Sequence, residues 1–237
     1  ALEHEKQVID ACKNDDHTLL QSYLEEPRNP DLPITFVHKF KGMWPLHIAV
    51  HHGSLQCIHL LLDANANINP RDANGGRTPL DIAAEHGQME VIRCLIEARA
   101  DVNKSDIFDA TPLQNAAIHG HMEVVRFLIE AGADKDRSDI EGFKPLQIAA
   151  GHGHLDVVRF LTEVPADKDK SVEDDLSTSL QSAARNGHIE IVRFLIEVGA
   201  DKDKPDINGK TPVQAAVAHG HTEVASFLSA SAKSGQS

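Results

Sequence analysis

A Pro-Leu dipeptide, or a close variant of it, recurs along this chain at an almost constant interval. The copies begin at Pro45, Pro79, Pro112, Pro145, Ser179 and Pro212. Successive copies are 34, 33, 33, 34 and 33 residues apart. A constant period of this length indicates a stack of similar supersecondary units, and it has to be recognised before any other interpretation.

One copy of the repeat, residues 111–134, shows what a unit consists of. Thr111 is a good helix N-cap, Pro112 suits the first helical position, and Gln114 completes a capping box with Thr111. Gly120 ends this first short helix, and apolar residues at helical spacing over 124–129 predict a second helix. Two short helices cannot bury both of their apolar faces alone, so each unit needs a neighbour on either side.

These stretches resemble ankyrin repeats. The matching segments are T-P-L-D-I-A-A-E-H-G (78–87), T-P-L-Q-N-A-A-I-H-G-H (111–121), P-L-Q-I-A-A-G-H-G-H (145–154) and the loop motif A-G-A-D (131–134). The resemblance implies an all-α ankyrin-repeat solenoid, in which helix-turn-helix units stack and are joined by β-hairpin-like finger loops. It implies about seven units, including terminal caps.

The period also divides the chain into segments. Residues 1–27 are expected to form an N-terminal capping helix pair, and residues 28–41 an extended loop that contains aromatic residues. Five repeats are expected at 42–75, 76–108, 109–141, 142–175 and 176–208. A C-terminal capping repeat at 209–230 and a disordered tail at 231–237 complete the prediction.

The first departure from the repeat lies at residues 28–44. Trp44 stands where the other units have a capping residue, so we expect the following helix to lack its side-chain cap. Two interpretations of the apolar and aromatic residues in this loop remain open. They pack on the first repeat as an extended hairpin, or they form a binding loop.

The second departure lies at residues 163–180. One residue is inserted there, Leu176 replaces a turn glycine and Ser179 replaces the proline. We still expect Thr178 and Gln181 to form a capping box. We expect this junction to be the weakest joint of the stack.

The charge of the chain restricts its partners. The 237 residues carry 23 Lys and Arg against 36 Asp and Glu, a formal net charge of −13. This charge disfavours nucleic acid and anionic membrane surfaces, and it favours a partner protein with a basic or mixed basic and apolar surface. The sequence contains no apolar run long enough to span a membrane. We expect a cytoplasmic monomer, with a nuclear location as an alternative; a chain that starts at Ala1 leaves secretion open.

Histidine and cysteine are the residues most suggestive of chemistry. The histidines recur on both sides of the helix-ending glycine in successive units, so they are interpreted as structural. His47, His51 and His52 form the densest group, and a metal-dependent enzyme built around them is an alternative. The three cysteines occupy apolar helical positions and are interpreted as buried thiols. No catalytic, metal-binding or cofactor-binding residue is predicted.

The resemblance places partner contacts on a concave face, at the finger tips and the exposed side of each first helix. The predicted contact residues are Met43, Trp44, His51, Arg77, Glu85, Ile107, Phe108, Ile118, Ile140, Phe143, Asp174, Asp175, Arg185 and Lys210. Phe108 and Phe143 are the residues that we most expect to be exposed. Packing between successive fingers is the alternative for the three finger isoleucines, Ile107, Ile140 and Ile207.

Four functions are weighed. The first is a non-enzymatic scaffold for protein–protein interaction. The second is an inhibitor or immunity protein that blocks an enzyme by binding it, and the third is the metal-dependent enzyme. The fourth is a substrate for asparaginyl hydroxylation, because Asn69 and Asn103 lie in stretches that resemble the modified finger of the ankyrin family.

Overall fold

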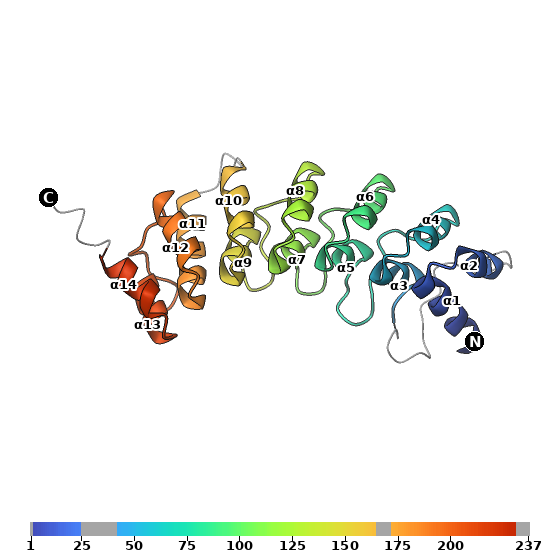
Figure 1. Cartoon of the computed structure of the whole chain (residues 1–237), viewed down its shortest axis with the longest axis horizontal. Helices are drawn as coiled ribbons and strands as arrows, with labels where there is room; N and C mark the ends of the chain where they lie inside the picture. The colour runs from blue at the N-terminus through green and yellow to red at the C-terminus, as the bar shows by residue number, and fades with distance from the viewer. Residues whose placement is uncertain (1, 25–41, 165–171, 231–237) are drawn as a thin grey trace. The chain divides into compact units, whose positions relative to one another are not determined.

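The computed structural model describes residues 2–24, 42–164 and 172–230, and these residues are all-α, as predicted (Figure 1). They form fourteen helices, and none of them lies in a β-strand. The predicted loop at 28–41 and the predicted tail at 231–237 lie outside the described residues. The chain divides into two compact units: Ala1–Ala116 with Glu123–Asp134, and Ala117–Met122 with Lys135–Ser237. They are called unit 1 and unit 2 below.

Unit 1 is built from helix pairs. Its helices are α1 (Leu2–Asn14), α2 (His17–Leu24), α3 (Pro45–His52), α4 (Leu55–Asp63), α5 (Pro79–Glu85) and α6 (Met89–Glu97), together with most of α7 (Pro112–His119) and α8 (Met122–Glu130). The first helices of successive pairs contact each other, as α3 and α5 do, and so do the second helices α4 and α6. Leu46, Leu80 and Ile92 are among the fully buried side chains of this core.

Unit 2 repeats the same arrangement. Its helices are α9 (Pro145–His152), α10 (Leu155–Glu163), α11 (Val172–Asn186), α12 (Ile189–Glu197), α13 (Pro212–Ala218) and α14 (Thr222–Ala230). Helix α11 contacts both α9 and α13, and α12 contacts both α10 and α14. In α10 and α12, the second helices of two pairs, an arginine lies over a phenylalanine of the next pair. The Arg159 guanidinium is 4.4 Å from the centre of the Phe194 ring, and the Arg193 guanidinium is 4.5 Å from the centre of the Phe227 ring.

The predicted capping boxes start several of the first helices. At α5, the Asp81 backbone N–H donates to Thr78 Oγ1 at 3.2 Å, and the Thr78 backbone N–H donates to Asp81 Oδ2 at 2.7 Å. Thr111 with Gln114 and Thr211 with Gln214 make the same two bonds. Two backbone donors that the helix would leave unsatisfied are thereby paired at each start.

The cap at α3 is partly retained, although Trp44 replaces the threonine. The Trp44 side chain makes no capping hydrogen bond, as predicted. However, the Trp44 backbone N–H donates to His47 Nδ1 at 3.1 Å. His47 therefore does what the aspartate or glutamine does at the other helix starts.

The prediction of a capping box at Thr178 and Gln181 was wrong. Helix α11 begins at Val172, so Thr178 lies inside the helix and its hydroxyl donates to the Asp175 carbonyl at 3.1 Å. At the other first helices the proline lacks an N–H, and its ring disfavours a helical conformation in the residue before it. Ser179 imposes neither restriction, and the helix therefore continues past the expected start.

An aspartate closes each loop that precedes a regular first helix. Asp72 Oδ1 accepts from the backbone N–H groups of Gly75 and Arg77, both at 3.0 Å. Asp106, Asp139 and Asp206 each accept two backbone N–H groups in the same way. One backbone hydrogen bond crosses the base of each of these loops, as from Asp72 N–H to the Arg77 carbonyl at 3.0 Å. The described fingers are thus turns held by a carboxylate rather than paired strands.

Candidate functional site

The described part of unit 2 contains a groove of about 470 Å³. One wall is the loop that carries Glu141 and Phe143, and the opposite wall is the loop that carries Asp206 and Ile207. One side of α11 lines the space between these loops, with Gln181 among its lining residues. The groove therefore collects predicted contact residues from three separate segments: Phe143, Asp175 and Arg185.

Between these walls, residues 172–178 are helical rather than part of a finger turn. In a regular repeat, a turn held by an aspartate would precede the first helix. Here residues 172–178 belong to α11 instead, so the two neighbouring loops face a helix surface. Buried Ser177 accepts from the Asp201 backbone N–H at 3.2 Å, which ties α11 to the next loop.

Two ion pairs connect α11 to the walls of the groove. Lys144 Nζ lies 2.5 Å from Asp175 Oδ1, and Arg185 Nη2 lies 3.5 Å from Asp206 Oδ2. Hydrogen bonds from backbone N–H groups, above all that of Lys210, and the nearby Arg185 charge lower the pKa of the Asp206 carboxyl. These charges are engaged within the protein, whereas the exposed Glu141 carboxylate forms no ion pair among the described residues.

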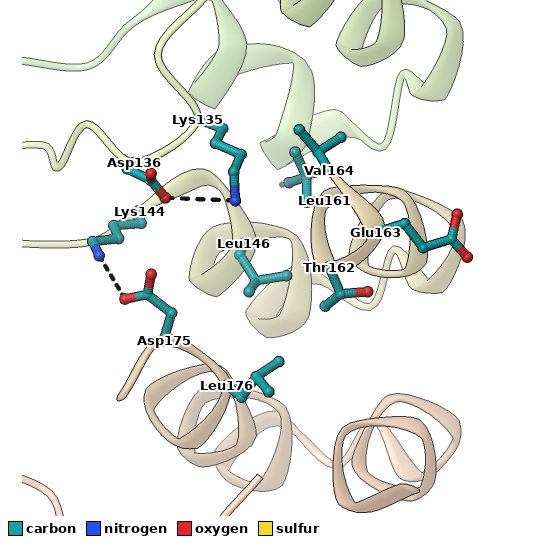
Figure 2. Close-up of a pocket in the computed structure, with 10 residues that line it drawn as sticks. All are labelled: Lys135, Asp136, Lys144, Leu146, Leu161, Thr162, Glu163, Val164, Asp175 and Leu176. Atoms are coloured by element: carbon teal, nitrogen blue, oxygen red, sulfur yellow. Dashed lines mark hydrogen bonds and ion pairs between the residues drawn. The ribbon is translucent and has the colours of Figure 1, made fainter. Parts of the chain in front are cut away.

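A second hollow of about 250 Å³ in unit 2 also has Lys144 and Asp175 among its lining residues (Figure 2). Leu146, Leu161 and Leu176 line it, and Figure 2 shows the Lys144 and Asp175 side chains pointing toward one another at its rim. This hollow is bordered by Val164, and residues 165–171, which follow it, lie outside the described residues. We therefore assign it no role.

Unit 1 contains a smaller hollow of about 220 Å³, and predicted contact residues gather there too. Met43, His51, Arg77 and Glu85 line it together. Arg77 Nη1 is 3.1 Å from Glu85 Oε2, and Arg77 Nε is 3.3 Å from Asp72 Oδ2. Met43 is only 7% exposed, so it contributes little surface to a partner.

The sequence matches the family model described as ankyrin repeats in three copies, over residues 8–106, 100–174 and 165–236. The chain belongs to the ankyrin repeat family. Ankyrin repeats are protein–protein interaction modules, and the family is generally non-enzymatic. No helix of this ankyrin repeat protein, within the residues described, is long and apolar enough to cross a membrane.

The finger residues of the ankyrin repeats differ in exposure. Phe108 is 56% exposed, Ile140 is 67% exposed and Ile207 is fully exposed, whereas Phe143 is half-buried. Ile107 is 58% exposed, and its backbone N–H donates to the Gly75 carbonyl of the preceding loop at 3.0 Å. Ile140 and Ile207 are thus largely in solvent, whereas the Ile107 side chain lies beside Gly76 of the preceding finger, as the packing alternative expects.

The remaining predicted contact residues are scattered. Trp44 is half-buried and its indole Nε1 donates to the Arg71 carbonyl at 3.0 Å. Ile118 is half-buried and Lys210 is exposed. Asp174 lies in α11, but its side chain is outside the described set.

His47 is held by two hydrogen bonds that leave neither ring nitrogen for a metal. Its Nδ1 accepts from the Trp44 backbone N–H, so its Nε2 carries the proton that is donated to the Arg77 carbonyl at 3.0 Å. Burial, the largest effect, lowers the pKa of His47 to about 4. Within the described ranges, no three His, Cys, Asp or Glu side chains are placed to hold a metal ion.

Other histidines bond helix ends and neighbouring pairs, as the structural interpretation predicts. His86, His152 and His219 each place Nδ1 within 3.0 Å of the carbonyl four residues earlier. His154 and His188 instead place Nε2 at 2.8 and 3.0 Å from the carbonyls of Ile118 and Gly151 in the preceding pair. These rings therefore hold the stack together.

The two asparagines considered for hydroxylation link successive loops. Asn69 Oδ1 accepts from the Asp101 backbone N–H at 3.0 Å. Asn103 Oδ1 accepts from the Asp134 N–H at 2.8 Å, and its Nδ2 donates to the Gly132 carbonyl at 3.2 Å. Both side chains thus have a structural role in the native state.

Cysteine burial follows the prediction in two of three positions. Cys12 and Cys57 are fully buried, and a hydrogen bond with Cys57 followed by burial raises the pKa of Cys12. Cys94 is only half-buried. Burial also raises the pKa of Cys94.

Sequence reasoning did not identify Gln181 as a residue of the candidate site. Its place in the repeat marked it as a capping residue, and it was not counted among the contact residues. The signal was available in Ser179, since the loss of proline allows a helix to extend.

Proposed function

We propose that this ankyrin repeat protein is a non-enzymatic scaffold that binds another protein through the groove of unit 2. The observation that carries the proposal is the groove itself, in which the Phe143 ring and the exposed Ile207 side chain flank the surface of α11. Aromatic and aliphatic side chains beside a concave surface are the usual anchors of protein partners. Phe108 provides a separate apolar contact in unit 1.

The partner that fits best has a basic or mixed basic and apolar surface. The chain carries a net charge of −13, which attracts a basic partner over a distance. Apolar contacts in the groove then supply affinity that salt does not screen. We therefore expect the association rate to fall with ionic strength more steeply than the dissociation rate rises.

Affinity capture with quantitative mass spectrometry tests the proposal. The wild-type chain is compared with Phe108→Ala, Phe143→Ala and the double variant, and Val198→Ala serves as the matched control. Val198 is 41% exposed and is absent from the lining of the groove. We expect Phe143→Ala to lower the affinity for a specific partner about tenfold, as for an interface anchor, with thermal stability nearly unchanged. A large loss of stability with unchanged binding would contradict the assignment.

A further inference from the structure

The finger of residues 105–110 in unit 1 carries three consecutive exposed residues at its tip. Ile107 is 58% exposed, Phe108 is 56% exposed, and Asp109 is exposed as well. Within the described part of the chain, the Phe108 ring contacts no other ring or cation, and the Asp109 carboxylate forms no ion pair. Two large apolar side chains and a carboxylate thus meet solvent on one finger, which is more than a single exposed apolar residue of an ordinary surface. Residues 107–109 are called the Phe108 tip below.

The backbone of the Phe108 tip is held by hydrogen bonds. Asp106 Oδ1 accepts from the Phe108 backbone N–H at 2.8 Å. The Ile107 backbone N–H donates to the Gly75 carbonyl of the preceding finger at 3.0 Å, and the Ile107 side chain lies beside Gly76. Because this backbone is already ordered, a partner that covers the tip loses little affinity to ordering it.

The other fingers show that the fold does not require the side chains of Phe108 and Asp109. Asp109 has a φ of 58°, in the left-handed region that glycine adopts without steric cost. Glycines with positive φ stand at this place in the other described fingers: Gly76, Gly142 and Gly209. Phe108 stands where two of these fingers have the polar residues Glu141 and Asn208. The aromatic ring and the carboxylate are therefore available for recognition.

The charge around the Phe108 tip indicates which side chain fits it. Residues 101–110 contain three aspartates and one lysine, in a chain whose net charge is −13. A lysine places its long aliphatic stem on an apolar surface and keeps its ammonium in water. On this tip, the stem can cover apolar side chains while the ammonium pairs with the Asp109 carboxylate.

We propose that the Phe108 tip is a docking surface of its own, which a partner protein covers with aliphatic side chains around one lysine. The aliphatic groups contact Ile107 and Phe108, and the lysine ammonium pairs with Asp109. The tip belongs to unit 1 and contains none of the residues that line the groove of unit 2. Binding at the two places can therefore be tested separately.

A peptide titration followed by NMR tests the inference on the full chain. The probe is the capped peptide acetyl-Ala-Leu-Lys-Leu-Ala-amide, and two analogues carry Nε-acetyl-lysine or glutamate instead of lysine. Acetylation removes the charge but keeps the stem, whereas glutamate reverses the charge. We expect the lysine peptide to shift the Phe108 ring signals and to bind about threefold more tightly than the acetylated peptide, the effect of one exposed ion pair. The glutamate peptide is expected to bind least.

Variants separate the apolar contribution from the charge. Phe108→Ala is expected to lower the affinity for all three peptides, whereas Asp109→Asn removes only the preference for lysine over acetyl-lysine. The matched control Glu97→Gln removes the same charge from an exposed position at the end of α6, and it is expected to keep the preference. Asp109→Gly introduces the residue of the other fingers, so it is expected to remove the preference while the melting temperature stays within about 2 °C of wild type.

Several outcomes would overturn the inference. These are equal binding of the lysine and acetyl-lysine peptides, a preference that survives Asp109→Asn, and no shift of the Phe108 ring at millimolar peptide. Phe108 signals that change with protein concentration alone would also overturn it, because a second copy of the chain would then cover the tip. Shifts confined to the groove around Phe143 would refute docking at the Phe108 tip and leave the proposed function standing.

Discussion

The Thr78–Asp81 start of α5 in unit 1 and the Thr178–Gln181 segment of α11 in unit 2 have equivalent positions in the repeat but different structures. At the first, the capping box closes and the helix begins at Pro79. At the second, the helix runs through the expected cap and begins at Val172. The comparison teaches that the pair of capping residues does not by itself decide where a helix starts.

Three sequence differences account for the longer helix. Ser179 replaces a proline, Leu176 replaces a glycine, and Glu173 stands where the other loops have the aspartate that accepts two backbone N–H groups. A serine continues a helix where a proline stops it, and a leucine favours helix over a left-handed turn. The extra methylene of glutamate disfavours the tight turn that aspartate makes with its own backbone.

The two segments also differ in the hydrogen bonds of Asp81 and Gln181, which hold equivalent positions in the repeat. Asp81 Oδ2 accepts from the Thr78 N–H and hydroxyl, and Asp81 Oδ1 accepts from Asn115 Nδ2 at 3.3 Å. Both of its oxygens are used. Gln181 Oε1, by contrast, is buried and has no donor among the described residues. The regular joint therefore satisfies its buried acceptors, whereas the irregular one leaves a buried acceptor without a donor.

The largest expected effect concerns the buried carboxyl of the regular joint. Burial, the largest cause, raises the pKa of Asp81 to about 7, against 3.8 for an unperturbed aspartate. A raised folded-state pKa stabilises the fold below pH 3.8, and this stabilisation is lost as the pH rises toward 7. Asn cannot ionise at this position. We therefore expect the free energy of unfolding of Asp81→Asn to rise by about 4 kcal/mol relative to that of wild type as the pH goes from 4 to 8. Urea unfolding at several pH values measures the difference, and a constant difference would contradict the prediction.

The second largest expected effect is at His47, whose contribution to stability depends on pH in the opposite direction. The pKa of His47 is lowered to about 4 from 6.5, so its contribution is complete above pH 6.5 and is lost as the pH falls toward 4. Glutamine stands at this position in the pairs that contain Gln114, Gln147, Gln181 and Gln214, and it can make both hydrogen bonds. We expect the free energy of unfolding of His47→Gln to rise by about 3 kcal/mol relative to that of wild type as the pH falls from 7 to 4. The same urea series measures it, with His59→Gln, an exposed position, as the control. Parallel curves for wild type and His47→Gln would refute it.

A proline can convert the irregular start into a regular one. In Ser179→Pro, the helix is expected to begin at residue 179 and the Thr178 N–H to bond Gln181 Oε1. The same substitution three residues later, Ser182→Pro, breaks the helix without a cap to replace it. We expect Ser182→Pro to cost about 2 kcal/mol more than Ser179→Pro, because an interior proline costs about 3 kcal/mol. Hydrogen exchange of residues 175–178 should rise in Ser179→Pro, and unchanged protection there would argue against the conversion.

The smallest effect separates the two threonines. Thr78→Ala removes an N-cap and leaves the Asp81 backbone N–H without its acceptor, at an expected cost of about 1 kcal/mol. Thr178 is exposed within a helix, so Thr178→Ala is expected to change stability by less than about 0.5 kcal/mol. Chemical unfolding of the two variants measures both costs. Equal costs would mean that Thr178 caps a helix in solution.

The sequence by itself determined the family, the helix pairs and the regular capping boxes. Thr111 and Gln114, for example, are read correctly because a helix start depends on residues within four positions of one another. The structural histidines also follow, since their place beside each glycine repeats with the period. Local patterns of this kind need no knowledge of distant contacts.

Only the tertiary structure decided the rest. The bond from Asn115 to Asp81 joins residues 34 positions apart, and the groove combines three segments between residues 141 and 208. The unused oxygen of Gln181 arises because α11 takes the Thr178 donor while the next loop takes both protons of the amide. Which donors meet which acceptors depends on how the helices pack, and no single stretch of sequence contains both partners.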